Sequence, residues 1–426
     1  MSLRPPGYRN RIIDSTIDSM LASIGAISVE GPKWCGKTWT SLNHANSVFY
    51  MADPAGGFAN REVARLDFTA ALDGDTPHAI DEWQEVPGIW DAVRFQVDMR
   101  SKPGQFILTG SSTPSDDSVV HSGTGRIARI RMRPMTLTES GASTGEISLT
   151  DVVSGASPRP IRSACTLDQI VDLVVRGGWP ASLGTTTDQA ADLARSYLDN
   201  IALTDISQVD GSARDPEKVM ALLRSFARNT ATMVGPAALE RDVAETSGPG
   251  LSAKTIREYM ALLERLYLLE QIPAWHPALR SPVKFRQTPK RMLVDPSLAV
   301  AGLNASPADL KQDPKTLGFL FESMILRDLL TYAQSARATL WHYRDDAGLE
   351  ADAVLTFPSG VWAAIEIKLG YTQIDAAAQN LVRLARKMSE AGDSYPAAMI
   401  VIVGVGGVSH RRDDGVCVIP ADLLGL

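Results

Sequence analysis

The fold is decided by residues 26–38, which read AISVEGPKWCGKT. The run AISVE suits a buried strand, and the spacing G-x-x-x-x-G-K-[ST] that follows is matched by Gly31, Gly36, Lys37 and Thr38. Glycines at these positions let backbone N–H groups turn toward a phosphate, and the next helix presents its positive dipole end to the anion. The pattern therefore predicts a phosphate-binding loop. The alternative is a glycine turn that happens to precede a lysine.

The residues of this loop have distinct expected roles toward a nucleotide. Lys37 would reach the β- and γ-phosphates and is a candidate catalytic residue, whereas the Thr38 hydroxyl would bind Mg²⁺. The candidate nucleotide-binding residues are Gly31, Pro32, Lys33, Trp34, Cys35, Gly36, Lys37, Thr38 and Trp39. The expected ligands are a nucleoside triphosphate and Mg²⁺.

Another apolar run, HAIDEWQE at residues 78–85, leads into two adjacent carboxylates. Asp81 would hold Mg²⁺ through water, and Glu82 would orient or deprotonate the attacking water as a catalytic residue. The adjacent Asp-Glu pair favours hydrolysis over kinase-type transfer. The alternative is the solvated first turn of a helix, where the helix dipole favours acidic residues.

Hydroxyl and guanidinium groups follow on the next two apolar runs. QFILTGSS, residues 105–112, carries Thr109 and Ser111, whose hydroxyls are candidate sensors of the γ-phosphate, although hydroxyls are common at strand ends. GRIARIRMRP carries four arginines, one of which is expected to be an arginine finger, with Arg126 as the candidate. The remaining three share one strand face that could equally be solvated or paired with acids: Arg129, Arg131 and Arg133.

The order of apolar patterns predicts the domain organisation. Short apolar runs alternate with helix-length segments over residues 26–133, which predicts an α/β domain with an open, mostly parallel sheet. Residues 140–164 are rich in Gly, Ser, Thr and Pro and predict a loop or junction. The expected regions are the α/β ATP-binding domain at 1–165, a helical subdomain at 166–234, a winged-helix region at 235–316 and an α/β domain at 317–426.

The winged-helix expectation rests on residues 234–275, which read as a helix, a Gly-rich turn, a second helix and the start of a hairpin. Residues 251–292 contain eight Lys or Arg against three Glu, a local excess that suits contact with a phosphate backbone. The candidate nucleic-acid contacts are Lys254, Arg257, Lys284, Arg286, Lys290 and Arg291. The alternative is a packing module whose basic hairpin meets acidic neighbours.

A second group of candidate site residues lies in EADAVLTFPSGVWAAIEIKLG near the C-terminus. If Phe357 pairs with Val361 across the turn, Asp352 lies opposite Glu366, and alternation brings Lys368 to the same face. Two carboxylates side by side suit a divalent cation, and Glu322 on the preceding helix would be the fourth member. The arrangement resembles the degenerate PD-(D/E)XK nuclease pattern. The alternative is an inactive relic or an ion-pair cluster.

Taken in order along nearly the whole chain, these motifs resemble a known family, the bacterial and archaeal AAA-like ATPases with a C-terminal domain of uncharacterised function. The resembling stretches are EGPKWCGKT, AIDEWQEVPGIWDAVRFQVD, FILTGSS, GRIARIRMRPMTLTE, GGWPASL, YLDNIALTDI, residues 251–273, FLFES, ADAV and AIEIK. The resemblance implies an ATP-binding domain of the additional-strand P-loop class, a winged-helix region and a PD-(D/E)XK-like C-terminal fold. Trp34 and Cys35 depart from the usual loop residues, and DPSLAV replaces the usual Asp-Thr-Gly-Leu-Ala.

Composition limits the classes of partner. The 426 residues have a formal net charge of −7, so net charge does not draw the whole molecule to nucleic acid. Three distant cysteines argue against a disulfide framework or a zinc site and fit a reducing cytosol. The N-terminal residues lack the apolar segment of a secretory signal, and the longest apolar stretch is shorter than the roughly 20 residues that cross a bilayer. We therefore expect a cytoplasmic protein without a membrane partner.

Three functions remain open from the sequence. The first is a Mg²⁺-dependent ATPase whose nucleotide state is coupled to nucleic-acid binding, with DNA as the candidate partner. The second is an ATP-regulated, metal-dependent DNA nuclease, and the third is a non-cleaving ATP-dependent switch or scaffold. The oligomeric state is open, as is whether an arginine finger acts within one subunit or across two.

Overall fold

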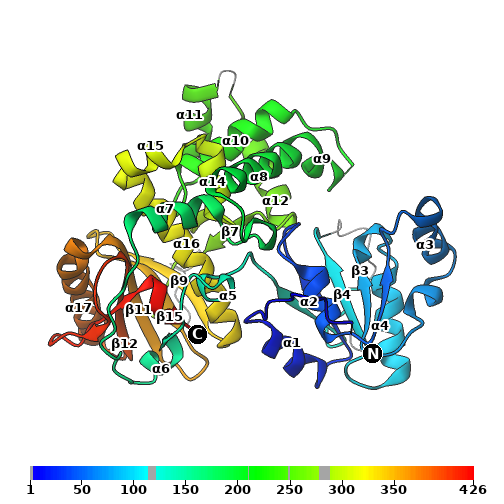
Figure 1. The fold of residues 1–426 in the computed structure, drawn as a ribbon, viewed down its shortest axis with the longest axis horizontal. Helices are drawn as coiled ribbons and strands as arrows, with labels where there is room; N and C mark the ends of the chain where they lie inside the picture. Colours follow the sequence, from blue (N-terminus) through cyan, green and yellow to red (C-terminus); the bar gives the residue numbers. More distant parts are fainter. Residues whose placement is uncertain (1–2, 114–120, 210, 248–249, 278–287) are drawn as a thin grey trace.

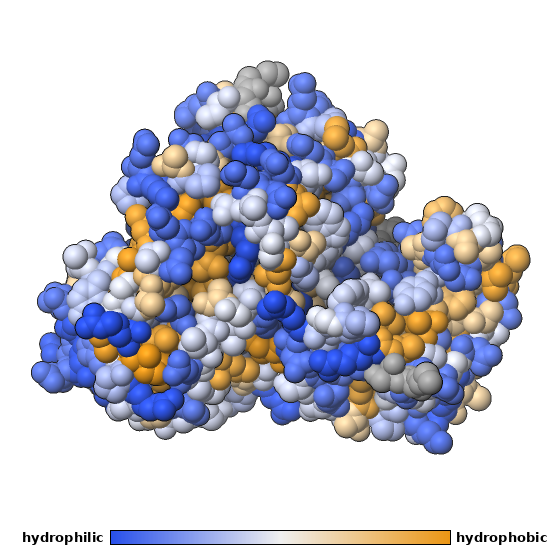
Figure 2. All heavy atoms as spheres, viewed as in Figure 1, coloured by the Kyte–Doolittle hydropathy of each residue, from blue (hydrophilic) through white to orange (hydrophobic). Residues whose placement is uncertain are grey.

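The computed structural model describes residues 3–113, 121–209, 211–247, 250–277 and 288–426. Figure 1 shows the N-terminal sheet domain at the right, the second sheet domain at the left, and the helices of the middle of the chain above both. Within the described ranges, no helix combines the length and apolar character needed to cross a bilayer. In Figure 2, hydrophilic residues cover most of this face, and hydrophobic ones form smaller groups over both sheet domains.

The N-terminal sheet has five parallel strands in the order β2-β3-β4-β1-β5. These strands are β1 Ala26–Glu30, β2 Ser47–Tyr50, β3 His78–Asp81, β4 Phe106–Gly110 and β5 Ile127–Arg131. Strand β4 lies between β1 and β3, as expected for an additional strand between the phosphate-binding loop and the acidic pair. The parallel α/β sheet predicted from the sequence is confirmed.

Helices cover both faces of this sheet, and β1 and β4 are accordingly buried along their whole length. The helical elements are α1 Asp14–Leu21, α2 Lys37–His44, α3 Ala55–Leu66 and α4 Ile89–Arg100, with 3-10 turns at Phe68–Leu72 and Trp83–Glu85. Because the strands are parallel, their carboxyl ends share one edge of the sheet. The loop after β1 and the acidic pair after β3 therefore meet at that edge.

The junction predicted at residues 140–164 lies on the C-terminal domain rather than on the domain that precedes it. It follows α5 Leu137–Ser140 and contains β6 Ile147–Ser148 and α6 Leu149–Val153. Strand β6 pairs with β15 Leu424–Gly425, and Ser143 Oγ donates to the Leu424 carbonyl at 2.7 Å. These pairings join residues far apart in the sequence.

The helical middle region contains α7 Leu167–Arg176, a 3-10 turn at Pro180–Ser182, α8 Thr187–Asn200, a π-helical stretch at Ile201–Asp205, α9 Ile206–Gln208 and α10 Pro216–Arg228. It continues into α11 Pro236–Ser247, α12 Ala253–Arg265 and the antiparallel strands β7 Leu269–Ile272 and β8 Lys290–Leu293. Thr232 also bridges Arg291 of β8. Helices followed by a strand pair are the order that the sequence predicts for a winged helix.

The C-terminal domain has a mixed sheet in the order β13-β14-β12-β11-β10-β9. Its helices are α16 Pro314–Ser335 and α17 Ile374–Glu390, with 3-10 turns at Tyr371–Gln373 and Ala421–Leu423. The preceding helices α14 Pro296–Leu303 and α15 Pro307–Gln312 belong to the helical middle region, where α14 packs against α7, α8 and α10 and α15 packs against α7. Its strands are β9 Thr339–Arg344, β10 Glu350–Thr356, β11 Trp362–Gly370, β12 Ala398–Val405, β13 His410–Arg411 and β14 Cys417–Pro420. The predicted register is confirmed, because Thr356 pairs with Trp362 and Phe357 N donates to the Val361 carbonyl at 2.8 Å.

Candidate functional site

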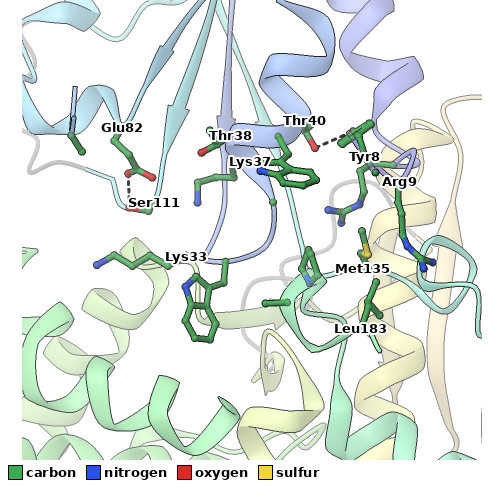
Figure 3. A pocket seen from close by; sticks show the side chains of 18 of the residues that line it. Tyr8, Arg9, Lys33, Lys37, Thr38, Thr40, Glu82, Ser111, Met135 and Leu183 are labelled. Atoms are coloured by element: carbon green, nitrogen blue, oxygen red, sulfur yellow. Dashed lines mark hydrogen bonds between the residues drawn. The ribbon is translucent and has the colours of Figure 1, made fainter. Parts of the chain in front are cut away.

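A pocket of about 980 Å³ lies at the carboxyl edge of the N-terminal sheet. In Figure 3, Glu82 and Ser111 lie on one side of the pocket, Tyr8, Arg9, Met135 and Leu183 on the other, and Lys37 and Thr38 between them. The lining residues include members of the N-terminal segment, the predicted loop, the turn that begins at Glu82, the end of β4 and the loop before α8. The pocket therefore joins segments that are far apart in the chain.

The predicted phosphate-binding loop has backbone positions that demand glycine. Gly36 has φ +101°, in the left-handed region, and a Cβ atom on Gly31 would lie 2.2 Å from the Met132 carbonyl oxygen. Helix α2 begins directly at Lys37, so its N-terminal dipole end faces the loop. The buried Lys37 ammonium donates to the Pro32 carbonyl at 2.9 Å, within the loop itself.

Two hydroxyls converge on one carboxylate oxygen beside this loop. Thr38 Oγ1 donates to Asp81 Oδ1 at 2.8 Å, and Thr109 Oγ1 donates to the same atom at 2.7 Å. Burial and the neighbouring charge of Glu82 raise the pKa of Asp81, while the bond from Thr109 opposes that rise. A hydroxyl and a carboxylate are oxygen donors of the kind that Mg²⁺ prefers, so the residues present fit that ion.

Glu82 is held toward the end of β4. Its backbone has φ 56°, and its N–H donates to Thr109 Oγ1 at 2.9 Å. Ser111 Oγ donates to Glu82 Oε2 at 2.8 Å, drawn as a dashed line in Figure 3, and Gln84 Nε2 donates to the same oxygen. The carboxylate expected to activate water thus faces the end of β4, where Thr109 lies in the strand and Ser111 directly follows it.

The N-terminal segment forms a wall that sequence reasoning missed. Tyr8, Arg9 and Arg11 line the pocket, and the Tyr8 hydroxyl lies 3.1 Å from Thr40 Oγ1. Arg11 is buried, and its Nη1 donates to the Cys35 carbonyl of the phosphate-binding loop at 2.8 Å. The aromatic and basic residues of GYRNR just before α1 were the available signal in the sequence.

The GGWPASL loop supplies another wall that was missed. Pro180 and Leu183 line the pocket, and the Gly178 N–H donates to Asp295 Oδ2 at 2.9 Å. Asp295 is itself paired with Arg327 of α16, and their side chains are fully buried. A wall of the pocket is therefore fastened to residues more than 100 positions later in the chain.

Residues of the phosphate-binding loop also contact the helical middle region. Trp34, with φ 68°, has its ring centroid 5.6 Å from that of Tyr197 on α8, and the Tyr197 hydroxyl donates to the Lys33 carbonyl at 3.2 Å. Lys33 Nζ lies 2.8 Å from Asp205 Oδ1 in the π-helical stretch. The unusual Trp34 is thus accommodated by an aromatic neighbour outside the sheet domain.

The four candidate arginines do not reach the pocket of their own subunit. Arg126 lies beside the amino end of β1, opposite the phosphate-binding edge, and its Nε pairs with Asp98 at 2.8 Å. The other three arginines are paired with acidic residues, which was one of the alternatives expected for them. Arg129 lies 2.9 Å from Glu30. Glu270 of β7 pairs with Arg131 at 3.2 Å and with Arg133 at 3.0 Å. This placement does not support a catalytic role for Arg126 within one subunit.

The candidate nucleic-acid contacts fall into separate environments. Lys254 and Arg257 are exposed on α12, whereas Lys284 and Arg286 lie outside the described residues. Lys290 and Arg291 differ from the expectation of surface contacts, since they are only 7% and 8% exposed. Lys290 pairs with Glu322 of α16, and Arg291 donates to the Val234 carbonyl. Packing of the β7–β8 strand pair against both neighbours buries these two cations.

The structure brings together the four residues of the predicted nuclease-like site. Lys368 Nζ lies 3.0 Å from Asp352 Oδ2 and 2.5 Å from Glu366 Oε2. Glu322 joins them through Lys290, whose Nζ is also 3.8 Å from Asp352 Oδ1. Within the described parts of the chain, however, no group of three or more His, Cys, Asp or Glu side chains has an arrangement that could hold a metal ion.

Three family models match successive parts of the chain. An AAA domain matches residues 24–141, a domain of unknown function (DUF8612) matches 167–309, and a second domain of unknown function (DUF4143) matches 317–424. The chain is 24% identical over 409 residues to uncharacterized proteins of Mycobacterium tuberculosis and Mycobacterium bovis, which covers 93% of this chain and 80% of each relative.

Two solved structures show weak likeness. A Walker-type ATPase of Pyrococcus abyssi is 11% identical with a TM-score of 0.42, over 70% of this chain and 99% of that one. A Thermotoga maritima RuvB variant is 18% identical with a TM-score of 0.27, over 69% of this chain and 96% of that one.

Proposed function

We propose that this protein is a Mg²⁺-dependent ATPase. The observation that carries the proposal is the convergence of Thr38 and Thr109 on Asp81 Oδ1, beside a buried Lys37 and adjacent to Glu82. The match of residues 24–141 to an AAA domain supports it independently. These groups are those that nucleoside triphosphate hydrolysis requires: phosphate cradle, metal ligands and a base.

In this proposal the triphosphate lies over the loop that precedes α2. Lys37 exchanges its bond to the Pro32 carbonyl for the β- and γ-phosphate oxygens, and Thr38 and Asp81 would hold Mg²⁺, Asp81 through water. When bound, Mg²⁺ neutralises charge on those oxygens. Glu82 orients the attacking water and accepts its proton, while Ser111 keeps the carboxylate aimed.

The nucleobase belongs at the other end of the pocket. Tyr8 offers an aromatic ring there, Met135 and Leu183 offer apolar contact, and Arg9 offers positive charge, as Figure 3 lets the reader follow. This end is roofed by the N-terminal segment and the GGWPASL loop, on the side of the pocket away from Glu82. Base recognition and hydrolysis therefore use different segments of the chain.

Steady-state hydrolysis and calorimetric ATP binding test the proposal together. Lys37→Ala should lose both, because the phosphate charge is no longer countered. Glu82→Gln should bind ATP but turn over at least about 10²-fold more slowly, since a general base contributes about 10²–10⁴. The exposed Glu62, paired with Arg65, supplies Glu62→Gln as the matched control. Full activity in Glu82→Gln would exclude that residue as the base, and no ATP binding by the wild type would exclude the function.

We further propose that the nucleotide state is passed to the winged-helix region and alters nucleic-acid binding there. Thr113, three residues beyond β4, accepts from Arg265 Nε at 3.0 Å, and its N–H donates to the Arg265 carbonyl at 3.0 Å. The Tyr267 hydroxyl lies 2.7 Å from Thr113 Oγ1 and 2.9 Å from Glu30 Oε2, directly before the phosphate-binding loop. These bonds join the candidate sensor strand to the end of α12, which carries the exposed Lys254 and Arg257.

Anisotropy of a fluorescent DNA duplex tests this second step. Replacing Lys254 and Arg257 by Ala should weaken binding and reduce the salt slope by about two phosphate contacts. Lys311→Ala with Lys315→Ala, both exposed, is the matched control. Affinity should also differ between ATP and ADP in the Glu82→Gln background. If neither duplex nor single-stranded DNA binds at low salt, the DNA partner is excluded and a switch acting on other proteins takes its place.

A further inference from the structure

Several carboxylate side chains lie together in the C-terminal domain, where the nuclease resemblance implies a divalent metal ion. We define the charge cluster as Lys290, Glu322, Asp352, Glu366 and Lys368, which come from β8, α16, β10 and β11. A hard divalent cation needs several carboxylate oxygens with free lone pairs directed at one point. The question is whether the oxygens of this cluster are available.

Three of the four carboxylate oxygens of Asp352 and Glu366 already have donors. Asp352 Oδ2 accepts from the Ile367 N–H at 2.8 Å and from Lys368 Nζ at 3.0 Å. Glu366 Oε1 accepts from Asn380 Nδ2 at 2.6 Å, and its Oε2 lies 2.5 Å from Lys368 Nζ. The two carboxylates expected to share a metal are therefore bridged by an ammonium group instead.

The Lys290 ammonium group occupies the space between Glu322 and Asp352. Its ammonium pairs with Glu322 Oε1, donates to the Asp352 carbonyl oxygen at 3.3 Å and lies 3.8 Å from Asp352 Oδ1. The Lys290 side chain is 9% exposed, and those of Glu322 and Asp352 are 12% and 11% exposed. Two ammonium groups thus stand against three carboxylates in a nearly dry site. The residues as arranged do not fit a divalent metal.

Lys290 also connects this cluster to the rest of the molecule. It opens strand β8, where it pairs with Ile272 of β7, and β7 carries Glu270. The buried Glu270 binds Arg131 and Arg133 at the end of β5, in the ATP-binding domain. One strand pair is therefore ion-paired to the N-terminal sheet domain on one side and to the C-terminal domain on the other.

We propose that Lys290 is a tethered cation that closes the carboxylate cluster to divalent metal ions and fastens the β7–β8 strand pair to the C-terminal domain. The cluster is then a structural joint between regions, not a metal-dependent nuclease centre. Breaking one partner of a buried pair leaves an uncompensated charge, whereas replacing both by apolar groups is often neutral. In a structural joint, the stability lost in either single variant should therefore be largely recovered in the double variant. In a site where each residue has its own role, the two losses should add.

A double-mutant cycle in thermal unfolding tests the joint. Lys290→Met and Glu322→Leu should each lower Tm by several degrees, and the double variant should recover most of the loss, because Asp352 keeps its bonds to Lys368 and Ile367. Lys311→Met, which breaks an exposed pair with Asp168, is the control and should leave Tm nearly unchanged. Additive losses in the double variant would overturn the joint.

Mn²⁺ binding to the otherwise intact chain gives a second readout that does not depend on the variants of the cycle. Titration calorimetry without nucleotide, in the Asp81→Asn background that removes the other candidate metal ligand, should show no saturable Mn²⁺ binding at millimolar concentration. Saturable binding that a further Asp352→Asn change abolishes would overturn the closure. Because ATP hydrolysis is assayed separately in the wild type, failure of this inference leaves the proposed ATPase untouched.

Discussion

The Ser111 hydroxyl lies 2.8 Å from Glu82 Oε2, so the carboxylate after β3 is aimed by a residue beyond β4. Ser111→Ala should therefore lower kcat about tenfold with little change in ATP affinity, because the substitution loosens the orientation of Glu82 and not the grip on phosphate. Single-turnover hydrolysis together with calorimetric binding would measure the two effects separately.

Ser111→Thr retains the hydroxyl and is the matched control for this change. It should keep most of the wild-type kcat. A drop in ATP affinity with unchanged single-turnover rate in Ser111→Ala would contradict an orienting role, since that pattern belongs to a residue that contributes equally to ground-state and transition-state binding.

A buried ion pair underlies the N-terminal wall of the pocket. Arg11 Nε lies 3.1 Å from Glu139 Oε1, and the side chains are 3% and 2% exposed. Glu139→Gln should lower the free energy of unfolding by about 3 kcal/mol or more, because it leaves the guanidinium of Arg11 without its charge partner. Urea denaturation measures this loss.

The exposed pair of Glu62 and Arg65 supplies the comparison for that measurement, since Glu62→Gln should change stability by no more than about 1 kcal/mol. Equal losses of unfolding free energy in both variants would mean that the buried Arg11–Glu139 pair stabilises the fold no more than an exposed pair does. ATP affinity should fall only in Glu139→Gln, because Arg11 also supports the Cys35 carbonyl of the phosphate-binding loop.

The features that the sequence predicted well are set by residues that lie close together in the chain. The spacing of Gly31 and Lys37 fixes a loop geometry within eight residues, and the carboxyl ends of parallel strands bring Asp81 to it without knowledge of the rest of the fold. The turn at Pro358 likewise sets the register that places Asp352 beside Glu366, because side-chain alternation in a hairpin follows from the turn alone.

The sequence did not predict the contacts between segments that lie far apart in the chain. Tyr8 and Pro180 line the pocket only because distant segments fold over it. Tyr8 lies in no motif, and the GGWPASL stretch that contains Pro180 indicated only a family resemblance, with no role at the pocket. Lys290 was expected on a basic surface, since charge counts cannot reveal that a strand packs its cation against Glu322 of another domain. Similarly, Arg126 follows the motif order but lies at the edge of the sheet opposite the pocket.

Trp39 gives the nucleotide pocket an optical probe. It lines the pocket and is 49% exposed, so a bound nucleotide should change the environment of its indole. Trp34 also lines the pocket and is 48% exposed, so the test is made in a Trp34→Phe background. There, Trp39→Phe should remove most of the remaining ATP-dependent change in fluorescence, while Trp275→Phe, in the core of the C-terminal domain, should leave it intact. An undiminished change in Trp39→Phe, or one that persists in Lys37→Ala, would contradict placement of the nucleotide beside Trp39.

The ion pairs of His44, at the end of α2, with Asp14 and Asp18 of α1 should make the free energy of unfolding depend on pH. His44, the last residue of α2, lies 2.7 Å from Asp18 Oδ1 and 3.1 Å from Asp14 Oδ1, and Asp14 also accepts from the Tyr8 hydroxyl. Burial opposes charge on the imidazole, but the hydrogen bond and charge of Asp14, with those of Asp18, outweigh it and raise the pKa of His44.

A raised folded-state pKa means that the imidazolium stabilises the fold fully below the ordinary histidine pKa near 6.5, and that this stabilisation is lost as pH rises through the higher folded value. His44→Gln should therefore cost about 1 kcal/mol near pH 6, where Asp14, whose pKa is lowered, is still ionised, and clearly less near pH 9. Urea unfolding of both proteins at the two pH values measures the difference. A loss that is equal at both, or larger at pH 9, would show that the neutral imidazole carries the interaction and that the charge on His44 does not hold the N-terminal wall in place.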